Sequence, residues 1–160
     1  RRQRQMCIRD RFWNYVADDL KKLVDLNDNE FEVVLDENLF YKNASCSIHI
    51  KGNRQAGFIY EHLSGDQWMG LWFDNSLFDM SKINLYREDQ KDKITYNCNY
   101  LWWLSFKDLH ENFSTRDASM MILPNKARDY AKMKADDLFN LAVENKEHLK
   151  YIINNCLKDF

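Results

Sequence analysis

The stretch from Phe31 to Phe73 alternates apolar and polar residues through four short runs, which are separated by turn residues. A period of two places successive side chains on opposite faces of a strand, and it is typical of an antiparallel sheet with one buried face. The four runs cover residues 31–36, 45–51, 57–63 and 67–73. We therefore expect an antiparallel meander, and this expectation limits the fold more than any other feature of the chain.

Helical periodicity flanks these strands on both sides. Apolar residues recur at the spacing of one helix face over residues 12–24, and charged residues fall largely opposite them. The final third begins after Pro124, with Asn125 as a candidate N-cap, and contains no further Gly or Pro. Asn145 interrupts its apolar stripe, so one bent helix or two helices are both open. The sequence thus predicts an α+β fold with an N-terminal amphipathic helix, a meander of four to five strands, and a C-terminal helix or helix pair packed on the sheet.

The chain between the meander and the final helix gives a weaker signal. Residues 74–92 are polar, and we expect a long connection there that includes one helical turn. Residues 94–106 are rich in aromatic side chains and predict a fifth strand or a strand pair. Trp102 and Trp103 are adjacent, so on a strand one would enter the core while the other meets solvent, a helix or a partner.

The turns at 51–55 and 64–66 would set two hairpins, in which directly opposed residues share one face of the sheet. The back of the last two strands would then be apolar. It is either covered by a second helix or left open as a docking patch, and coverage is favoured. The residues placed on that back are Ile59, Leu63, Met69, Leu71 and Phe73. The residues placed on the core face are Phe31, Val33, Leu35, Cys46, Ile48, Ile50, Phe58, Tyr60, His62, Trp68, Gly70 and Trp72.

A chain of 160 residues has the length of one ordinary domain, and its composition suits a folded protein. Residues 1–11 differ from the rest, because they carry five arginines and one aspartate and lack an initiator methionine at their head. This segment resembles a sequencing adapter translated at the end of a metagenomic reading frame, although basic arms also occur on nucleic-acid binders. We expect residues 1–11 to be a non-native basic arm and residues 12–160 to form a single α+β domain.

Charge argues against nucleic acid as a partner. The formal net charge is −2 for the whole chain and −6 for residues 12–160, once the +4 of residues 1–11 is removed. An acidic domain repels phosphates unless its basic groups cluster, and here the modest clusters are interleaved with Asp. No apolar run approaches the roughly 18 residues that span a bilayer, and no signal peptide is recognisable. We therefore expect a cytoplasmic protein without a membrane segment.

Motifs for metals and cofactors are absent from the sequence. Its four cysteines and four histidines have no paired spacing, and no glycine-rich loop opens a helix. We therefore predict no metal and no cofactor. Cys46 would face His62 in the register above, but buried cysteine is usually inert packing, so we do not predict a nucleophile there.

The order of a helix, a strand meander and another helix resembles the restriction-endonuclease-like core. That resemblance implies a divalent metal ion held by acidic residues and a lysine on adjacent strands, for which Asp36 and the triplet His49-Ile50-Lys51 are the candidates. Here His49 stands two positions before the lysine, where the residue is usually acidic, and magnesium prefers oxygen ligands. A divergent nuclease is therefore the alternative hypothesis.

The first hypothesis is a non-enzymatic protein-binding domain, such as a bacterial or phage immunity, inhibitor or accessory factor. It is favoured over an enzyme because no convergent catalytic set is recognisable. Its partner is another protein, and the candidate partner-binding residues are Trp102, Trp103, Leu71 and Phe73.

The second hypothesis is an enzyme or ligand site on the polar part of the sheet. Its candidate residues are Asp36, His49, Lys51 and Glu61. The same residue types are also what any solvated face of an antiparallel sheet displays. A concave pocket that gathers three of the four would support chemistry, whereas a flat polar face would support binding of a partner.

Overall fold

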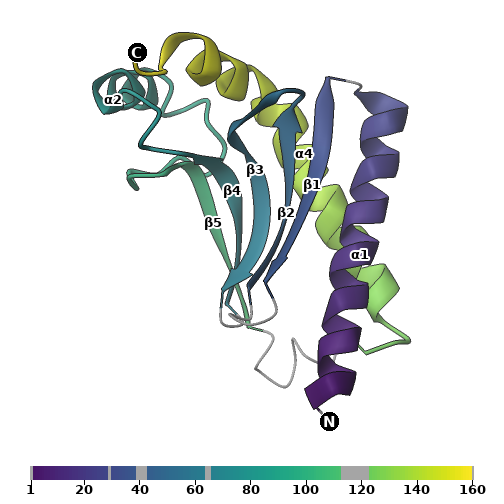
Figure 1. Cartoon of the computed structure of the whole chain (residues 1–160). Helices are drawn as coiled ribbons and strands as arrows, with labels where there is room; N and C mark the ends of the chain where they lie inside the picture. The colour runs from purple at the N-terminus through teal and green to yellow at the C-terminus, as the bar shows by residue number, and fades with distance from the viewer. Residues whose placement is uncertain (1, 29, 39–42, 64–65, 113–122, 160) are drawn as a thin grey trace.

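The computed structural model describes residues 2–28, 30–38, 43–63, 66–112 and 123–159 (Figure 1). Its strands form one antiparallel sheet in the order β1-β2-β3-β4-β5, so the predicted α+β meander is confirmed. The elements are, in chain order, α1 (Arg2–Asn27), β1 (Phe31–Asn38), β2 (Asn43–Ile50), β3 (Asn53–Leu63), β4 (Asp66–Phe73), α2 (Met80–Asp89), β5 (Trp103–Asn112) and α4 (Ala127–Asn155).

Both α1 and α4 pack on the same face of the sheet, which we call the helix face. In Figure 1, α4 crosses behind the strands and α1 runs beside β1. The side chains of Phe12, Trp13 and Leu138 are almost completely inaccessible in the layer between helices and sheet. Burying one large apolar side chain contributes about 1.5 to 3 kcal/mol, so this layer is the main source of stability. The strands contribute Phe31, Cys46, Ile48, Phe58, Tyr60, Leu71 and Phe73 to it.

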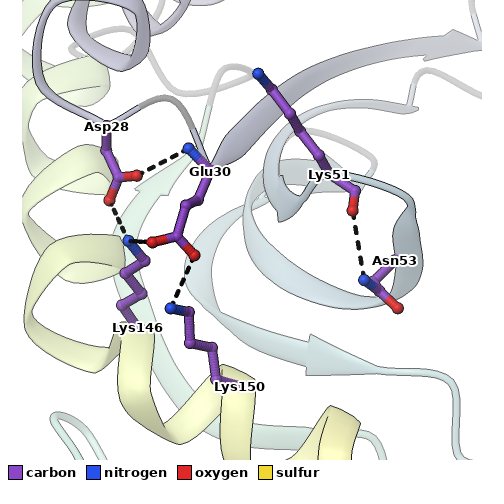
Figure 2. A network of polar contacts seen from close by, with 6 residues as sticks. All are labelled: Asp28, Glu30, Lys51, Asn53, Lys146 and Lys150. Carbon is purple, nitrogen blue, oxygen red and sulfur yellow. Dashed lines mark hydrogen bonds and ion pairs between the residues drawn. The ribbon is translucent and has the colours of Figure 1, made fainter.

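A cluster of ion pairs fixes the start of the sheet to α4 (Figure 2). Lys146 Nζ lies 2.6 Å from Asp28 Oδ2 and 3.1 Å from Glu30 Oε1. Lys150 Nζ lies 2.8 Å from Glu30 Oε2, and the hydrogen bonds from Lys150 and Lys146 hold the pKa of this carboxyl below its ordinary value. Lys51, on the turn after β2, donates its backbone N–H to the Glu30 carbonyl. The beginning of β1 is thereby anchored to both α4 and the neighbouring turn.

The predicted faces of β4 were wrong. The hairpin between β3 and β4 pairs Leu63 with Asp66, so Tyr60 lies opposite Met69 and Phe58 lies opposite Leu71. The predicted hairpin has one more residue in its turn, and a shift of one residue moves every side chain of a strand to the other face. Trp68, Gly70 and Trp72 consequently lie on the face opposite the helices, whereas Met69, Leu71 and Phe73 lie in the core.

The expected long connection after β4 contains a full helix. Asp79 caps α2, because its carboxylate accepts the backbone N–H groups of Ser81 (2.9 Å) and Lys82 (3.4 Å). Only Ile83 and Arg87 of this helix are buried, so it has no apolar stripe that periodicity could detect. The helix packs near the end of α4, where the rings of Tyr86 and Tyr151 stack at 4.1 Å.

The final helix is one continuous element, which answers the question that Asn145 left open. The Asn145 side chain is fully buried, where its amide donates to the Leu141 carbonyl and its oxygen accepts the Thr95 backbone N–H. It therefore ties α4 to the segment before β5 rather than breaking the helix. The residue at the N-cap position is Lys126, without a side-chain cap, and not the predicted Asn125.

The backbone of residues 2–11 belongs to α1 and continues into the helix that packs on the sheet. That this segment is non-native stays a prediction. None of the helices in the described ranges has the length and apolar character needed to cross a membrane.

Candidate binding groove on the sheet face opposite α1 and α4

The face opposite the helices, which we call the open face, carries its side chains in three rows across the strands. Strand pairing defines an acidic row of Asp36, Ser45, Glu61 and Trp68. The next row, called the central row, consists of Val34, Ser47, Ile59, Gly70 and Phe106. The third, called the aromatic row, consists of Glu32, His49, Gly57, Trp72 and Trp103.

A groove of about 390 Å³ runs over these three rows. Small side chains occupy its base, since Ser45, Ser47 and Gly57 leave room above the sheet that larger residues would fill. The rest of its lining is Val34, Asp36, His49, Arg54, Ile59, Glu61, Trp72, Trp102 and Trp103. The groove thus combines carboxylates at one end with tryptophans at the other.

Two glycines shape this face. A Cβ atom on Gly70 would lie 2.0 Å from the Ser105 carbonyl oxygen, so only glycine lets β4 and β5 approach as closely as they do. A Cβ atom on Gly57 would lie 2.4 Å from Nδ1 of His49, whose ring therefore rests over this glycine. The missing side chain at Gly57 gives the histidine its place at the base of the groove.

His49 is held on both ring nitrogens. Its Nδ1 lies 2.8 Å from the Ala56 carbonyl oxygen, which can only accept, so Nδ1 carries the proton. Its Nε2 lies 2.8 Å from Ser47 Oγ and accepts that hydroxyl proton when the ring is neutral. Burial lowers the pKa of this histidine, which favours the neutral ring at neutral pH.

A serine whose hydroxyl donates to histidine is also the first part of a nucleophilic site. Acyl transfer further needs donors for the developing oxyanion; the groove contains the carboxylates of Asp36 and Glu61, and Arg54 in its lining is paired with Glu32. An anionic intermediate beside these groups would be destabilised. The contacts with Ser47 and Ala56 fix the orientation of the His49 ring at the base of the groove.

The carboxylates of the groove are held differently from one another. Glu32, at the edge, pairs with Arg54 at 3.3 Å. Glu61 accepts a hydrogen bond from the indole N–H of Trp68, yet burial raises the pKa of its carboxyl. Asp36 is exposed, and neither Asp36 nor Glu61 forms an ion pair with any residue that the structure describes. A partly buried carboxylate without a cation is a place where a positively charged group gains energy by binding.

The aromatic end is positioned by a buried arginine from α2. Nη2 of Arg87 donates to the carbonyl oxygens of Tyr100 and Trp103, each at 2.9 Å. These bonds hold the segment that carries Trp102, whose side chain is 47% exposed, and Trp103, which is 5% exposed. Trp103 also packs edge-on against Phe106 with ring centroids 5.2 Å apart. As predicted, one of the adjacent tryptophans is buried and the other exposed, yet both line the same groove, because Trp102 lies before the first residue of β5.

The structure brings together residues that the sequence assigned to two different hypotheses. Asp36, His49 and Glu61 from the polar set line the groove with Trp102 and Trp103 from the partner-binding set. By the geometric criterion above, a concave surface that holds three of the four polar residues is the outcome that supports the second hypothesis, an enzyme or ligand site, whereas the tryptophans in the same groove are those of the partner-binding hypothesis.

Three of the predicted site residues lie elsewhere. Leu71 and Phe73 are fully buried on the helix face, so they cannot meet a partner at the surface, and the error follows from the shifted register of β4. Lys51 is exposed on the turn between β2 and β3 and does not line the groove. Trp72 was missed for the same reason as Leu71, since its true face follows only from the pairing of Leu63 with Asp66.

The pairing expected for Cys46 was also wrong. Cys46 lies opposite Tyr60, and His62 lies opposite Ala44. Burial raises the pKa of the Cys46 thiol to about 12, so the thiolate needed for nucleophilic attack is strongly disfavoured at neutral pH. Within the described ranges, no group of three or more His, Cys, Asp or Glu side chains could hold a metal ion.

Two other hollows are less suited to binding a ligand. One lies between β5 and α4, where Lys107 and Tyr96 already engage each other through a hydrogen bond and a cation–π contact. Another lies where α2 meets α4, beside the stacked rings of Tyr86 and Tyr151. In both hollows, the aromatic side chains that could contact a ligand already contact other side chains of the protein.

Comparison of the chain with protein-family models, with curated proteins and with solved structures gives no match.

Proposed function

We propose that this chain is a non-enzymatic binding domain that holds a segment of a partner protein in the groove of the open face. One observation carries the proposal: Trp72, Trp103 and the exposed Trp102 line one concave surface together with the carboxylates of Asp36 and Glu61, although Trp103 itself is buried. Tryptophan supplies large contact area with few degrees of freedom, and it is enriched where protein interfaces gain most of their energy. An immunity, inhibitor or accessory role would each use such a groove.

The groove supports binding better than metal-dependent nuclease cleavage. The lysine that the nuclease arrangement needs, Lys51, lies on a turn outside the groove. The two ring nitrogens of His49 are engaged by Ser47 and Ala56, so neither is free for a metal. Carboxylates along the groove would also repel the phosphates of a nucleic acid.

The test is selection from a library of random nine-residue peptides displayed on phage, with the immobilised chain as bait. Peptides enriched on the wild type are then assayed on Trp102→Ala and on Leu101→Ala. Leu101 is the matched control, because it is an exposed apolar neighbour of Trp102 that does not line the groove.

We expect enriched peptides that bind the wild type and Leu101→Ala equally and bind Trp102→Ala at least tenfold more weakly. Circular dichroism checks that both variants are folded. The proposal would be contradicted if no peptides were enriched. It would also be contradicted if the enriched peptides bound Trp102→Ala as tightly as the wild type.

A further inference from the structure

We infer that the groove takes an extended peptide segment in which a basic side chain and an apolar side chain are four residues apart, the basic one over the acidic row and the apolar one over the aromatic row. The inference rests on the proposed function and names the chemistry of its partner. It follows from the spacing of the rows, from the charges at one end and from the shape of the other end.

The spacing comes from the strands themselves. On each strand the acidic and aromatic rows are four residues apart, as between Glu32 and Asp36 or between Gly57 and Glu61. At about 3.3 Å per residue, the two rows are about 13 Å apart. An extended peptide lying along the strands has the same rise, and its side chains at positions i, i+2 and i+4 point to one side. Its first and fifth residues therefore reach the two ends of the groove.

Charge decides which end takes the basic group. Asp36 and Glu61 flank Ser45 on adjacent strands, so two carboxylates about 10 Å apart at the backbone converge on one small residue. At the far end, the charge of Glu32 is balanced by Arg54. A guanidinium or ammonium group placed between Asp36 and Glu61 would gain hydrogen bonds to ionised acceptors, which are the stronger kind.

The other end suits an apolar side chain. Trp72 and Trp103 are directly paired across β4 and β5, and Trp102 adds an exposed ring beside them. Burial lowers the pKa of His49, which favours its neutral ring, and both ring nitrogens are engaged by Ser47 and Ala56. This end therefore offers aromatic surface without an unpaired charge.

The central row limits which side chain the peptide can carry between its basic and its apolar residue. Ser47 and Ile59 form the middle of the groove, and Val34 lies at its side. The third residue of the segment meets this surface, and a small or hydroxyl-bearing side chain fits over the serine.

The probes are nine-residue synthetic peptides, acetylated and amidated so that their ends carry no charge. Two have an arginine and a leucine four residues apart, GSRSTSLSG and its reverse order GSLSTSRSG. A spacing control, GSSRTSLSG, has the same composition with the two residues three apart, which puts them on opposite sides of an extended chain. A charge control, GSESTSLSG, replaces the arginine with glutamate. Binding is followed by two-dimensional NMR of the ¹⁵N-labelled full chain, which detects millimolar affinities.

We expect at least one spacing-four peptide to bind at least tenfold more tightly than the spacing and charge controls. In Glu61→Gln this advantage over the charge control falls at least tenfold, while the glutamine oxygen still accepts the Trp68 indole N–H and the spectrum stays that of the folded chain. Equal binding of the spacing control, an unchanged preference in Glu61→Gln, or no binding of either spacing-four peptide at millimolar concentration would overturn the inference.

The phage selection separates this failure from failure of the proposed function. Selected peptides that depend on Trp102 but lack a basic residue would leave the binding domain in place and overturn the inference alone. Absence of any selected peptide would overturn both.

Discussion

The helix face and the open face are built from the same five strands, residue by residue in alternation. On the helix face, Phe58, Tyr60 and Leu71 are fully buried against the helices. On the open face, the neighbouring residues Ile59, Glu61 and Trp72 remain partly exposed. One face therefore gathers the apolar burial that stabilises the fold, and the other keeps charged and aromatic groups whose value lies in what they can bind.

The two faces of the sheet also differ in whether their charged groups form ion pairs. The ion pairs of Lys146 and Lys150 with Asp28 and Glu30 balance charge around the helix face (Figure 2). On the open face, burial raises the pKa of Glu61, which forms no ion pair with the residues described. A charged group that is poorly solvated and unpaired slightly lowers the stability of the fold. Binding sites commonly reduce stability in this way.

The largest effect should come from the helix face. Phe73→Ala should lower the free energy of unfolding by about 4 kcal/mol, because it removes a fully buried ring from the core. Trp102→Ala should lower it by less than about 1 kcal/mol, since that side chain is 47% exposed. Urea unfolding followed by circular dichroism measures both. Similar losses for the two variants would break the distinction between the faces.

Close contact of strands beneath the open face should give the next effect. Gly70→Ala should destabilise the chain by about 3 kcal/mol, because the added Cβ would lie 2.0 Å from a backbone oxygen of β5. Gly52→Ala is the control for loss of glycine in the hairpins: its φ of +79° is strained for alanine, but nothing lies within 4 Å of the new Cβ. If Gly52→Ala proves the more damaging variant in urea, the close approach of β4 and β5 is not what Gly70 provides.

Arg87 should couple α2 to the aromatic end of the groove. Arg87→Ala removes the guanidinium donor from the carbonyl oxygens of Tyr100 and Trp103, and leaves Trp103 with the weak thiol donor of Cys98 at 3.2 Å, which should cost about 2 kcal/mol. Because the segment bearing Trp102 is then released, tryptophan emission should shift to longer wavelength under native conditions. An unchanged native emission spectrum would show that Trp102 and Trp103 are positioned by something else.

His49 should make stability depend on pH. Its pKa is lowered in the folded chain, so the unfolded chain takes up a proton first as the pH falls below the ordinary value of 6.5. The stability that neutral His49 contributes is therefore present above pH 6.5 and is lost as the pH falls towards the folded pKa, by up to about 1.4 kcal/mol for each pH unit between the two pKa values. The difference in unfolding free energy between wild type and His49→Gln should shrink from pH 7.5 to 5.5. A difference that stays constant over this range would contradict the assignment.

The smallest effect should have the opposite sign. Glu61→Gln should stabilise the chain at neutral pH by at most about 1 kcal/mol, because it removes the cost of keeping a charge where burial opposes it. Below the ordinary carboxyl value of 4.5 the wild-type group is protonated in both states, so the gain should vanish there. Thermal unfolding from pH 4 to 7 tests this, and a variant that is less stable than wild type at pH 7 would count against it.

The fold class followed from sequence because alternation over 31–73 and helical periodicity at both ends are local signals. The faces of β4 did not follow, because they depend on whether two or three residues form the turn before it. The helix α2 escaped notice since it buries only Ile83 and Arg87. Each failure concerns a feature set by tertiary contacts rather than by local pattern.

The candidate site shows the same limit. Asp36 and Glu61 could be singled out from sequence for a polar site and Trp102 for partner binding, but these were two separate hypotheses. Their convergence requires the cross-strand register of β1 to β4 and the segment held by Arg87, neither of which alternation reveals. Trp72 could be added only once that register was known.

The most direct test of the central claim is to map where a bound spacing-four peptide contacts the ¹⁵N-labelled chain by NMR. We expect the indole N–H signals of Trp72, Trp102 and Trp103 and the backbone signals of residues 45–49 and 57–61 to move, while those of α1 and α4 stay in place. Shifts confined to α1 and α4, with the signals of the open face unmoved, would contradict it.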